Sequence, residues 1–305
     1  MNPIRTARSL YYNSPSGRLL LHPVRHIFRQ LKFNFWTDRS WIRKKFRETN
    51  DCDINLKQPS SFNEKILWLS LYERDPQKKN YVDKIKVREH ITNTIGNEYL
   101  IPLLHVTNNA RNLDPSKIKQ DSFVIKTNHD SGTVFIVRDK HHYDYSKIKD
   151  QLSKALNQNY YYATREWQYH NITPNILVES LITDTKGQLP KDFKFHCFNG
   201  QPLYIQVDSD RFTDHTRLFY DHQWKEQPFS MCYPKSAPIQ KPEKLEEMIE
   251  ISKELSKIFT YVRVDLYQLE NQVYFGELTF TPDAGFGSFN PIEWDKKLGK
   301  LLNVN

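Results

Sequence analysis

The sequence is poor in the residues that build several common kinds of site. Its three cysteines, Cys52, Cys197 and Cys232, are too few and too scattered for a disulfide framework or a CxxC zinc site. We therefore expect reduced thiols in a cytoplasmic protein. Apolar runs such as Leu19–Leu21 and Phe123–Ile125 fall far short of the roughly 20 residues that span a bilayer. Arginines recur through the first 30 residues with no apolar stretch between them, unlike a secretory signal.

Glycine is also scarce, with nine in 305 residues. The chain has no GxGxxG, no GxxxxGK[ST] and no GxSxG, so a Rossmann site, a P-loop and a nucleophile elbow are all unsupported. A nucleotide would have to be held by charged side chains and one small loop. Zinc fingers, RNP aromatics and basic-leucine heptads are absent as well, so we expect no nucleic-acid partner.

Positive charge is concentrated at the N-terminus. Residues 1–50 carry 11 Lys and Arg against two acidic residues, whereas residues 51–305 carry 33 basic and 34 acidic residues. Pro23 is placed to open a helix, with apolar residues following at the spacing of one helical face. Such a basic amphipathic arm can lie on an anionic membrane, hold a phosphate-rich polymer, or pack on the body with its charges in water. These three alternatives stay open.

The pattern of expected helices and strands in residues 51–305 is typical of an α+β protein. Ser61 and Glu64 form a capping box that opens a helix over 61–71. Short β-branched and aromatic runs then alternate with turns such as Asn199-Gly200, which favours hairpins over a doubly wound parallel sheet. We predict further helices at 81–94, 146–159 and 242–259, and strands at 103–106, 123–127, 133–137, 175–182, 193–198, 203–207, 218–220, 261–269 and 272–278.

Two strand ends place charge where a nucleotide could bind. Lys126 ends an apolar run and is followed by the turn 127–132, so a fixed cation and free N–H groups could meet phosphate oxygens. An ordinary hairpin with an exposed lysine explains the pattern equally well. Glu179 follows another apolar run, Ile176-Leu-Val178, and could accept hydrogen bonds from ribose or adenine. A glutamate at the end of a strand is common, however.

A third segment alternates charged and apolar side chains. Asp192, Lys194 and His196 share one face of a strand whose other face is apolar. A solvated face and a binding site account for this pattern about equally well.

A fourth segment is the most informative. Arg263 and Asp265 share a face, and a hairpin returns Glu277 beside them. Two carboxylates among apolar neighbours repel unless a divalent cation lies between them, and oxygen ligands suit Mg²⁺. Arg263 could then neutralise a transferred phosphoryl group. The alternative is a simple ion pair within the sheet.

In this order the pieces resemble the ATP-grasp fold, and more narrowly its TupA-like branch, which is associated with teichuronopeptide biosynthesis. The likeness covers about residues 55–300. The motifs that carry it are Ser61-Phe-Asn-Glu-Lys65 with Trp68, Val82-Asp-Lys84 with Val87-Arg88, Phe123-Val-Ile-Lys126, Lys191-Asp-Phe-Lys-Phe195 with Phe198-Asn-Gly200, Val262-Arg-Val-Asp265, and Gly276-Glu-Leu-Thr-Phe280.

The resemblance implies that ATP lies between two α+β lobes that follow a helical N-terminal segment. Lys126 would contact the phosphates under a flexible loop, with Lys84 as a second phosphate-binding lysine and Glu179 beside adenine and ribose. Lys194 would reach the γ-phosphate, and Arg263 would stabilise the acyl-phosphate and tetrahedral states. The residues implied to bind ATP are Lys84, Lys126, Asn128, Ser131, Gly132, Glu179 and Asp192.

The metal site departs from the family pattern at one position. Asp265 and Glu277 would hold Mg²⁺, but the family's Glu-x-Asn is here Glu277-Leu-Thr279. Thr279 offers only a hydroxyl, so Asp283 is an alternative second ligand.

By resemblance, the expected activity is ATP-dependent ligation of a carboxylate to an amine through an acyl phosphate. The acceptor would be a cell-surface polysaccharide or its lipid-linked precursor, with an amino acid as a possible second substrate. One alternative is a kinase, or a glycosyl or phosphoryl transferase, that acts on a sugar hydroxyl. Another is a non-catalytic binding protein whose basic arm attaches it to anionic lipid or polymer. In each case the expected location is the cytoplasm, where residues 1–50 could contact the inner face of an anionic membrane. The expected segments are a basic arm (1–50), a helical region (51–105), an N-lobe (106–185) and a C-lobe (186–305).

Overall fold

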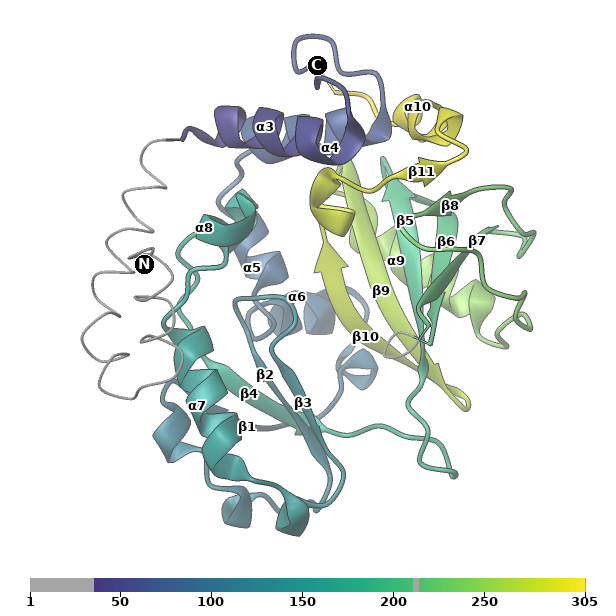
Figure 1. Ribbon diagram of the computed structural model, residues 1–305. Coiled ribbons are helices and arrows are strands. Elements are labelled where there is room, and N and C mark those ends of the chain that lie inside the picture. Colours follow the sequence, from purple (N-terminus) through teal and green to yellow (C-terminus); the bar gives the residue numbers. More distant parts are fainter. Residues whose placement is uncertain (1–35, 211–213, 305) are drawn as a thin grey trace.

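A computed structural model describes residues 36–210 and 214–304, and these residues form a mixed α+β fold. A helical N-terminal region comes first, as predicted, and two large sheets and a short two-stranded sheet of residues 230–231 and 289–290 follow it (Figure 1). The amphipathic helix expected after Pro23 lies outside the described residues. Over the described residues, no helix combines the length and apolar character needed to cross a bilayer. The N-terminal helices are α3 (Asp38–Asn50), α4 (Phe62–Tyr72), α5 (Lys78–Val82) and α6 (Val87–Thr94).

Local side-chain chemistry decides where these helices begin and end. Ser61 and Glu64 form both halves of the predicted capping box at the start of α4. The single helix predicted over 81–94 is wrong, because the chain breaks into α5 and α6. Asp83 ends α5, and its Oδ1 accepts a hydrogen bond from the backbone N–H of Ile85 at 2.9 Å. An aspartate that bonds the backbone two residues on competes with the helix.

The first sheet has four antiparallel strands in the order β1-β4-β2-β3. Helix α7 (Tyr145–Leu156) covers one face, where its Ile148 and Leu152 join a core that includes Phe123 and Ile125. Burial of these side chains fixes which face of β2 is left for polar residues. The strands are β1 (Leu103–Thr107), β2 (Phe123–Thr127), β3 (Val134–Val137) and β4 (Ile176–Ser180).

The second sheet has five antiparallel strands in the order β10-β9-β5-β6-β7. Helix α9 (Leu245–Ser256) packs on its apolar face through residues such as Leu245 and Met248, opposite Phe195 and Val264. The other face carries polar side chains and forms the candidate site. The strands are β5 (Lys191–Phe198), β6 (Gln201–Ser209), β7 (Thr216–Asp221), β9 (Tyr261–Leu269) and β10 (Gln272–Thr279).

Aromatic side chains join α4 to one end of this sheet. The ring of Phe62 lies 5.9 Å from that of Phe198, 5.2 Å from Tyr261 and 6.0 Å from Phe289. This contact ties the helical region to the β9 end that carries the site. The remaining elements are β8 (Ser230–Met231), β11 (Phe289–Asn290), α8 (Tyr161–Thr164), α10 (Glu293–Gly299), and the 3-10 turns η1 (Asn97–Tyr99), η2 (Ala110–Asn112), η3 (Pro115–Lys117), η4 (Lys140–His142), η5 (Trp167–Tyr169) and η6 (Pro282–Gly285).

Candidate active site

Two rows of polar side chains cross the second sheet. Lys194 on β5 is paired with Asp265 on β9, which is paired in turn with Glu277 on β10. The next row is formed in the same way by His196, Arg263 and Thr279. Residues directly opposite each other in an antiparallel sheet point to the same face. The two carboxylates that the sequence singled out therefore lie on one face.

A β-bulge at Gly276 puts Glu277 on that face. Phe275 pairs with Leu266 and Glu277 pairs with Asp265, so one residue of β10 is left over between them. In a regular ladder Gly276 would pair with Asp265, and Glu277 would pair with Val264 and turn toward the apolar core. A Cβ atom at Gly276 would lie 2.9 Å from the carbonyl oxygen of Asp265, closer than real Cβ contacts. Glycine is thus the residue that this close approach of the two strands requires.

Arg263 and Asp265 form a buried, bidentate ion pair. Nε and Nη2 of Arg263 each lie 2.7 Å from a carboxylate oxygen, and Nη2 also lies 3.7 Å from Oε1 of Glu277. Burial alone would raise the pKa of Asp265, but the charges of Arg263 and then Lys194 outweigh it and lower that pKa. The ion pair expected as the simple alternative is therefore present, and Glu277 lies beside it.

The charged row on β5 is buried, so the solvated-face interpretation is wrong. Lys194 has a relative exposure of 4%, and its ammonium contacts Asp192 and also Asp265, the latter at 3.2 Å. Burial lowers the pKa of Lys194, but the charges of Asp265 and Asp192 outweigh it and raise that pKa. Burial, followed by the charge of Arg263, lowers the pKa of His196 to about 3, so this imidazole is neutral.

The first sheet supplies a second group of charges. Glu179 on β4 accepts from Lys126 on β2 at 2.5 Å and from Arg88 on α6 at 3.2 Å. Lys126 is therefore held by a carboxylate, unlike the freely exposed lysine of an ordinary hairpin. Both oxygens of Glu179 are engaged in this arrangement, so contact with ribose or adenine would require exchange of one of these partners.

The break between α5 and α6 brings Lys84 to the turn after β2. Its Nζ donates to the carbonyl of Asp130 at 2.5 Å, and burial lowers its pKa. Asn128 is fully buried, with its amide bonded to Asp83 at 2.9 Å and to the backbone N–H of Asn175 at 2.7 Å. The side chain of Asn128 thus holds the turn in place.

The tip of this turn is open. Ser131 and Gly132 are exposed, Gly132 has φ +101°, and nothing lies within 4 Å of a Cβ built there. The side chain of Ser131 shares a hydrogen bond with Tyr160. The turn therefore offers a small, glycine-containing tip above Lys126, the arrangement expected of a phosphate-binding loop.

The two groups of charges face each other. After burial, the negative charge of Glu277 on β10 is the largest influence on the pKa of Lys84, followed by Lys126, Asp130 and Glu179. Coulombic influence falls with distance, so Lys84 lies near Glu277. Lys84 from the break between α5 and α6 and Lys126 from the first sheet are thus on the side of the carboxylate row that Glu277 ends.

The residues fit a Mg²⁺ ion that is held jointly with a polyphosphate. Glu277 has a side-chain exposure of 40%, and its Oε1 accepts from the hydroxyl of Thr279 at 3.2 Å and lies 3.7 Å from Nη2 of Arg263. Both oxygens of Asp265 already contact Arg263 or Lys194, so Asp265 would have to give up one of these contacts to bind Mg²⁺. The described residues contain no group of three His, Cys, Asp or Glu placed to hold a metal ion. Mg²⁺ commonly takes one or two carboxylates and completes its shell with phosphates and water.

Asp283, the alternative metal ligand, points elsewhere. Its Oδ2 accepts from Nη1 of Arg217 on β7 at 3.0 Å, and Arg217 also donates to Asp208 on β6 at 2.7 Å. With Gln206, which donates to Asp208 at 3.0 Å, these residues extend the polar face across β6 and β7. This extension was not predicted from the sequence, although polar Gln206 and Asp208 alternate with the apolar residues of β6.

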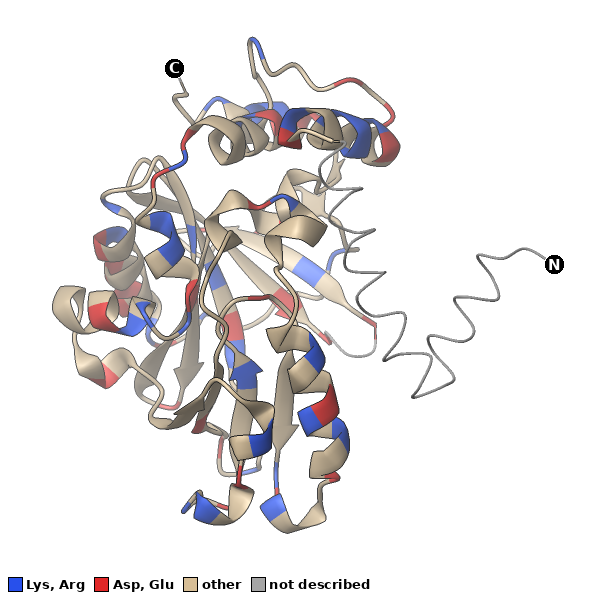
Figure 2. Ribbon diagram, turned by 90° about the vertical axis from the view of Figure 1, so that its left-hand side faces the viewer, with Lys and Arg blue, Asp and Glu red and all other residues tan. Residues whose placement is uncertain are grey.

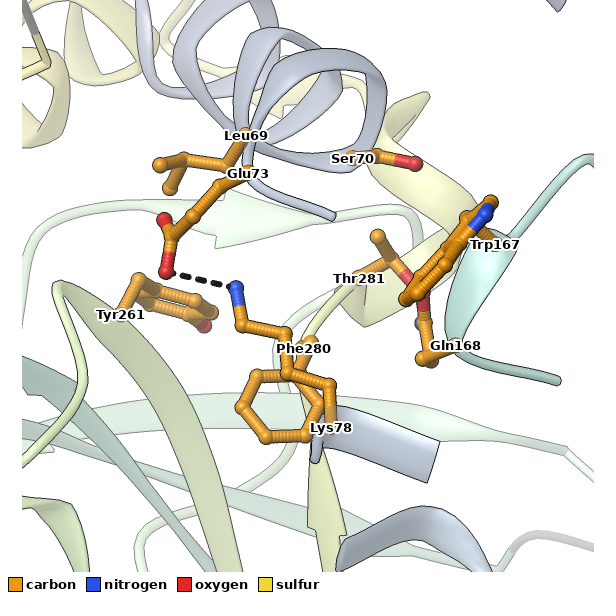
Figure 3. A pocket seen from close by; sticks show the side chains of 9 residues that line it. All are labelled: Leu69, Ser70, Glu73, Lys78, Trp167, Gln168, Tyr261, Phe280 and Thr281. Atoms are coloured by element: carbon orange, nitrogen blue, oxygen red, sulfur yellow. Dashed lines mark hydrogen bonds and ion pairs between the residues drawn. The ribbon is translucent and has the colours of Figure 1, made fainter. Parts of the chain in front are cut away.

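A small cavity lies near this end of β9 and β10 (Figure 3). Its volume of about 10 Å³ suits one water molecule rather than a nucleotide. Lys78 and Glu73 form an ion pair at 2.8 Å inside it. The lining residues are Leu69, Ser70, Glu73, Lys78, Trp167, Gln168, Tyr261, Phe280 and Thr281.

The chain was compared with family models, curated proteins and solved structures. The model of the TupA-like ATPgrasp family matches residues 64–303. No curated protein matches the chain. Among solved structures, D-alanine–D-alanine ligase from Bacillus anthracis is similar at 16% identity and a TM-score of 0.40, over 73% of this chain and 60% of the ligase. The ATP-grasp ligase PsnB, with a phosphomimetic precursor variant, Mg and ADP, is similar at 10% identity and a TM-score of 0.41, over 77% of this chain and 64% of PsnB. The chain thus spans less than two thirds of either ligase.

Proposed function

The chain belongs to the TupA-like ATP-grasp family, and we propose that it is an ATP-dependent carboxylate–amine ligase acting in the synthesis or modification of cell-surface polysaccharide. The observation that carries the proposal is the opposition of two buried or half-buried lysines, Lys84 and Lys126, to the row Lys194–Asp265–Glu277. Fixed cations on one side and a carboxylate row on the other are what a magnesium triphosphate needs.

In the proposed reaction, the lysines bind the phosphates and the carboxylates bind the metal ion. Lys84 and Lys126 bind phosphate oxygens beneath the turn that carries Ser131 and Gly132, and Lys194 approaches the γ-phosphate. Glu277, with Asp265 and Thr279, holds Mg²⁺, which offsets the charge of the phosphates when bound.

Arg263 then stabilises the charge that develops as the carboxylate substrate takes the γ-phosphoryl group. Attack by an amine on this acyl phosphate forms the amide and releases phosphate. The proposed acceptor is a polysaccharide or lipid-linked glycan that bears a uronic acid, and the proposed amine is an amino acid.

An ADP-release assay followed by mass analysis tests this function. The full chain is incubated with ATP, Mg²⁺, amino acids and either uronic-acid or neutral glycans. Ligation predicts ADP release that depends on both a carboxylate and an amine, and a product heavier by one amino-acid residue. A gain of one phosphoryl group on a neutral glycan, without an amine requirement, would instead establish a sugar kinase.

The proposal places the protein at the inner face of an anionic membrane. The support is the outer surface of α3, where Arg39, Arg43, Lys44 and Arg47 are exposed beside half-exposed Trp36 (Figure 2). Lys44 lies 3.8 Å from Glu48 and Arg47 lies 2.5 Å from Asp53, whereas Asp38 contacts Arg74 and Arg165. Arg39 and Arg43 therefore have no ion-pair partner in the part of the chain that the structure describes. A basic helix face with an aromatic at its edge suits anionic headgroups.

A further inference from the structure

Glu166 is a buried carboxylate outside the residues discussed so far. It lies between α8 and η5, in the segment that joins α7 to β4, and has a relative exposure of 8%. Its Oε2 accepts from the hydroxyl of Thr281, which in turn accepts from Nε2 of Gln168 at 2.9 Å. These bonds join the segment between α8 and η5 to the start of η6, just after β10.

Thr281 lies two residues beyond Thr279, the last residue of β10 and a candidate metal ligand. The hydroxyl of Thr281 thus holds the Glu166 carboxylate next to the end of β10. The negative charge of Glu277 also influences the pKa of Glu166, so the two carboxylates lie near each other. Glu166 is therefore beside the end of β10 that carries the proposed metal ligands.

Glu166 has no cationic partner among the residues that the structure describes. Burial, with the charge of Glu277 as a smaller contribution, raises its pKa to about 7, although hydrogen bonds from Thr281 and Thr164 oppose the shift. The titratable groups that face it are Glu277 on β10 and the two tyrosines of its own segment, Tyr160 and Tyr169.

Neither tyrosine can accept a proton near neutral pH. Burial and the charge of Glu166 raise the pKa of Tyr160 to about 12 and that of Tyr169 well above its usual value. A carboxylate that is partly protonated near neutral pH, by contrast, has the ideal affinity for taking up and releasing a proton in each turnover.

We infer that Glu166 is the catalytic base that accepts the proton of the attacking amine or hydroxyl. This inference rests on the proposed function, and neither the family pattern nor the sequence motifs single out Glu166. As the nitrogen lone pair bonds to the acyl carbon, the bond to the phosphate oxygen breaks and its electron pair leaves with phosphate. The N–H proton passes to Glu166, which returns it to the departing phosphate or to water.

The Glu166→Gln variant separates catalysis from a merely structural role. Glutamine keeps an acceptor oxygen for Thr281 but cannot take up a proton. We expect kcat to fall about 100-fold or more, KM for ATP to stay within about twofold, and the acid limb of the pH–kcat profile, centred near pH 7 in the wild type, to disappear. Glu73→Gln, on the far side of the neighbouring cavity, is the matched control and keeps that limb.

The Thr281→Val variant supplies a second, independent test. Valine lacks the hydroxyl that donates to Glu166, and this hydrogen bond lowers the pKa of Glu166. Without it, the acid limb of the pH–kcat profile should move to higher pH. An unshifted limb in Thr281→Val, or full kcat with the limb intact in Glu166→Gln, would overturn the inference and leave the proposed function standing. A wild type that releases no ADP with any acceptor would overturn the proposed function and this role together.

Discussion

At the scale of single residues, Asp265 distinguishes an enzyme from a binding protein. It is the shared partner of Arg263 and Lys194 and the neighbour of Glu277. If it positions Mg²⁺ and the phosphates, Asp265→Asn should lower ADP release about 100-fold or more. The substitution also removes a charge from a buried pair, at a cost of about 3 kcal/mol in the free energy of unfolding.

A matched control separates these two effects on Asp265. Asp208→Asn removes a carboxylate from the buried pair with Arg217, two strands away on the same face. We expect a similar loss of stability but a much smaller loss of activity, with rates compared below both melting temperatures. Wild-type ADP release by Asp265→Asn would favour the non-catalytic binding protein.

His196 should make the protein sensitive to acid. It is buried and neutral, bonded to Tyr261 at 2.8 Å and Gln206 at 3.0 Å, and its pKa falls from 6.5 to about 3. Between these two pKa values His196 is protonated in the unfolded chain but not in the folded chain. The free energy of unfolding therefore decreases as pH falls from about 6.5 toward 3. At pH 5 the loss is about 2 kcal/mol.

Denaturant unfolding at pH 7 and pH 5 measures this loss. The wild type should lose about 2 kcal/mol more than His196→Asn between the two pH values, and other ionisable groups cancel in the difference. His105→Asn, at an exposed position on β1, is the matched control and should follow the wild type. Equal slopes for wild type and His196→Asn would show that His196 is not the group responsible.

The residue scale also shows where sequence reasoning succeeds and where it ends. Strand alternation correctly placed Arg263 and Asp265 on one face, because period two is a local property. The salt bridges of Lys126 with Glu179 and the bond of Lys84 to Asp130 join segments far apart in the chain, so no local pattern contains them. Glu166 was missed because its burial and its isolation from cations arise only in the folded chain.

At the scale of elements, the bulge in β10 controls the site. Gly276→Ala puts a methyl group 2.9 Å from the carbonyl of Asp265, so the bulge must move or the strands must separate. We expect about 1–3 kcal/mol of destabilisation together with a fall in kcat, as Glu277 leaves the face of Asp265. Gly187→Asn is the control, since a Cβ there lies 3.9 Å from the flexible side chain of Arg138, and asparagine tolerates the φ of +74°.

Thermal melting and ADP release together check this prediction. A stable Gly276→Ala variant with full activity would show that the register of Glu277 does not matter. The hydrophobic pattern of β10 alone cannot reveal the bulge, because Phe275 and Glu277 are two apart and would share a face in a regular strand. The structure separates them by inserting one residue, and only the pairing with β9 shows it.

The same scale explains the outcome for the helices. The capping box of Ser61 and Glu64 was predicted correctly, because its bonds lie within four residues. The predicted helix over 81–94 failed because Asp83 bonds both Ile85 and the distant Asn128, and the second contact stabilises a break that the apolar spacing does not show. That break delivers Lys84 to the turn after β2.

At the scale of the whole molecule, the order of the motifs carried the resemblance that implied an ATP-grasp-like α+β fold, and the structure has this mixed α+β architecture. Each motif alone also fits an ordinary hairpin or ion pair, but their succession constrains which strands must meet. The order of the motifs does not predict that the polar face continues to Gln206, Asp208 and Arg217. That continuation depends on how β6 and β7 pair beside β5. The boundaries predicted at residues 50, 105 and 185 stay predictions.

The surface of α3 leads to the last prediction. Arg39 and Arg43 are exposed and have no ion-pair partner among the described residues, so their charges are available to an anionic surface. If the full chain binds anionic membranes through this surface, sedimentation with phosphatidylserine-containing vesicles should weaken steeply with salt. Charge reversal of both arginines to Glu should weaken binding at least about tenfold, because each basic residue near the headgroups contributes about 1 kcal/mol.

The control for this prediction changes the same number of charges elsewhere. Lys147 and Lys154 lie on exposed positions of α7, on the outer side of the first sheet, and already have acidic neighbours within α7 or at its start. Their reversal to Glu should leave vesicle binding nearly unchanged if position matters, and should weaken it as much as the α3 variant if only net charge matters. Equal binding of the wild type to neutral and anionic vesicles would contradict an electrostatic contact, since phosphatidylcholine offers the arginines no net charge to pair with.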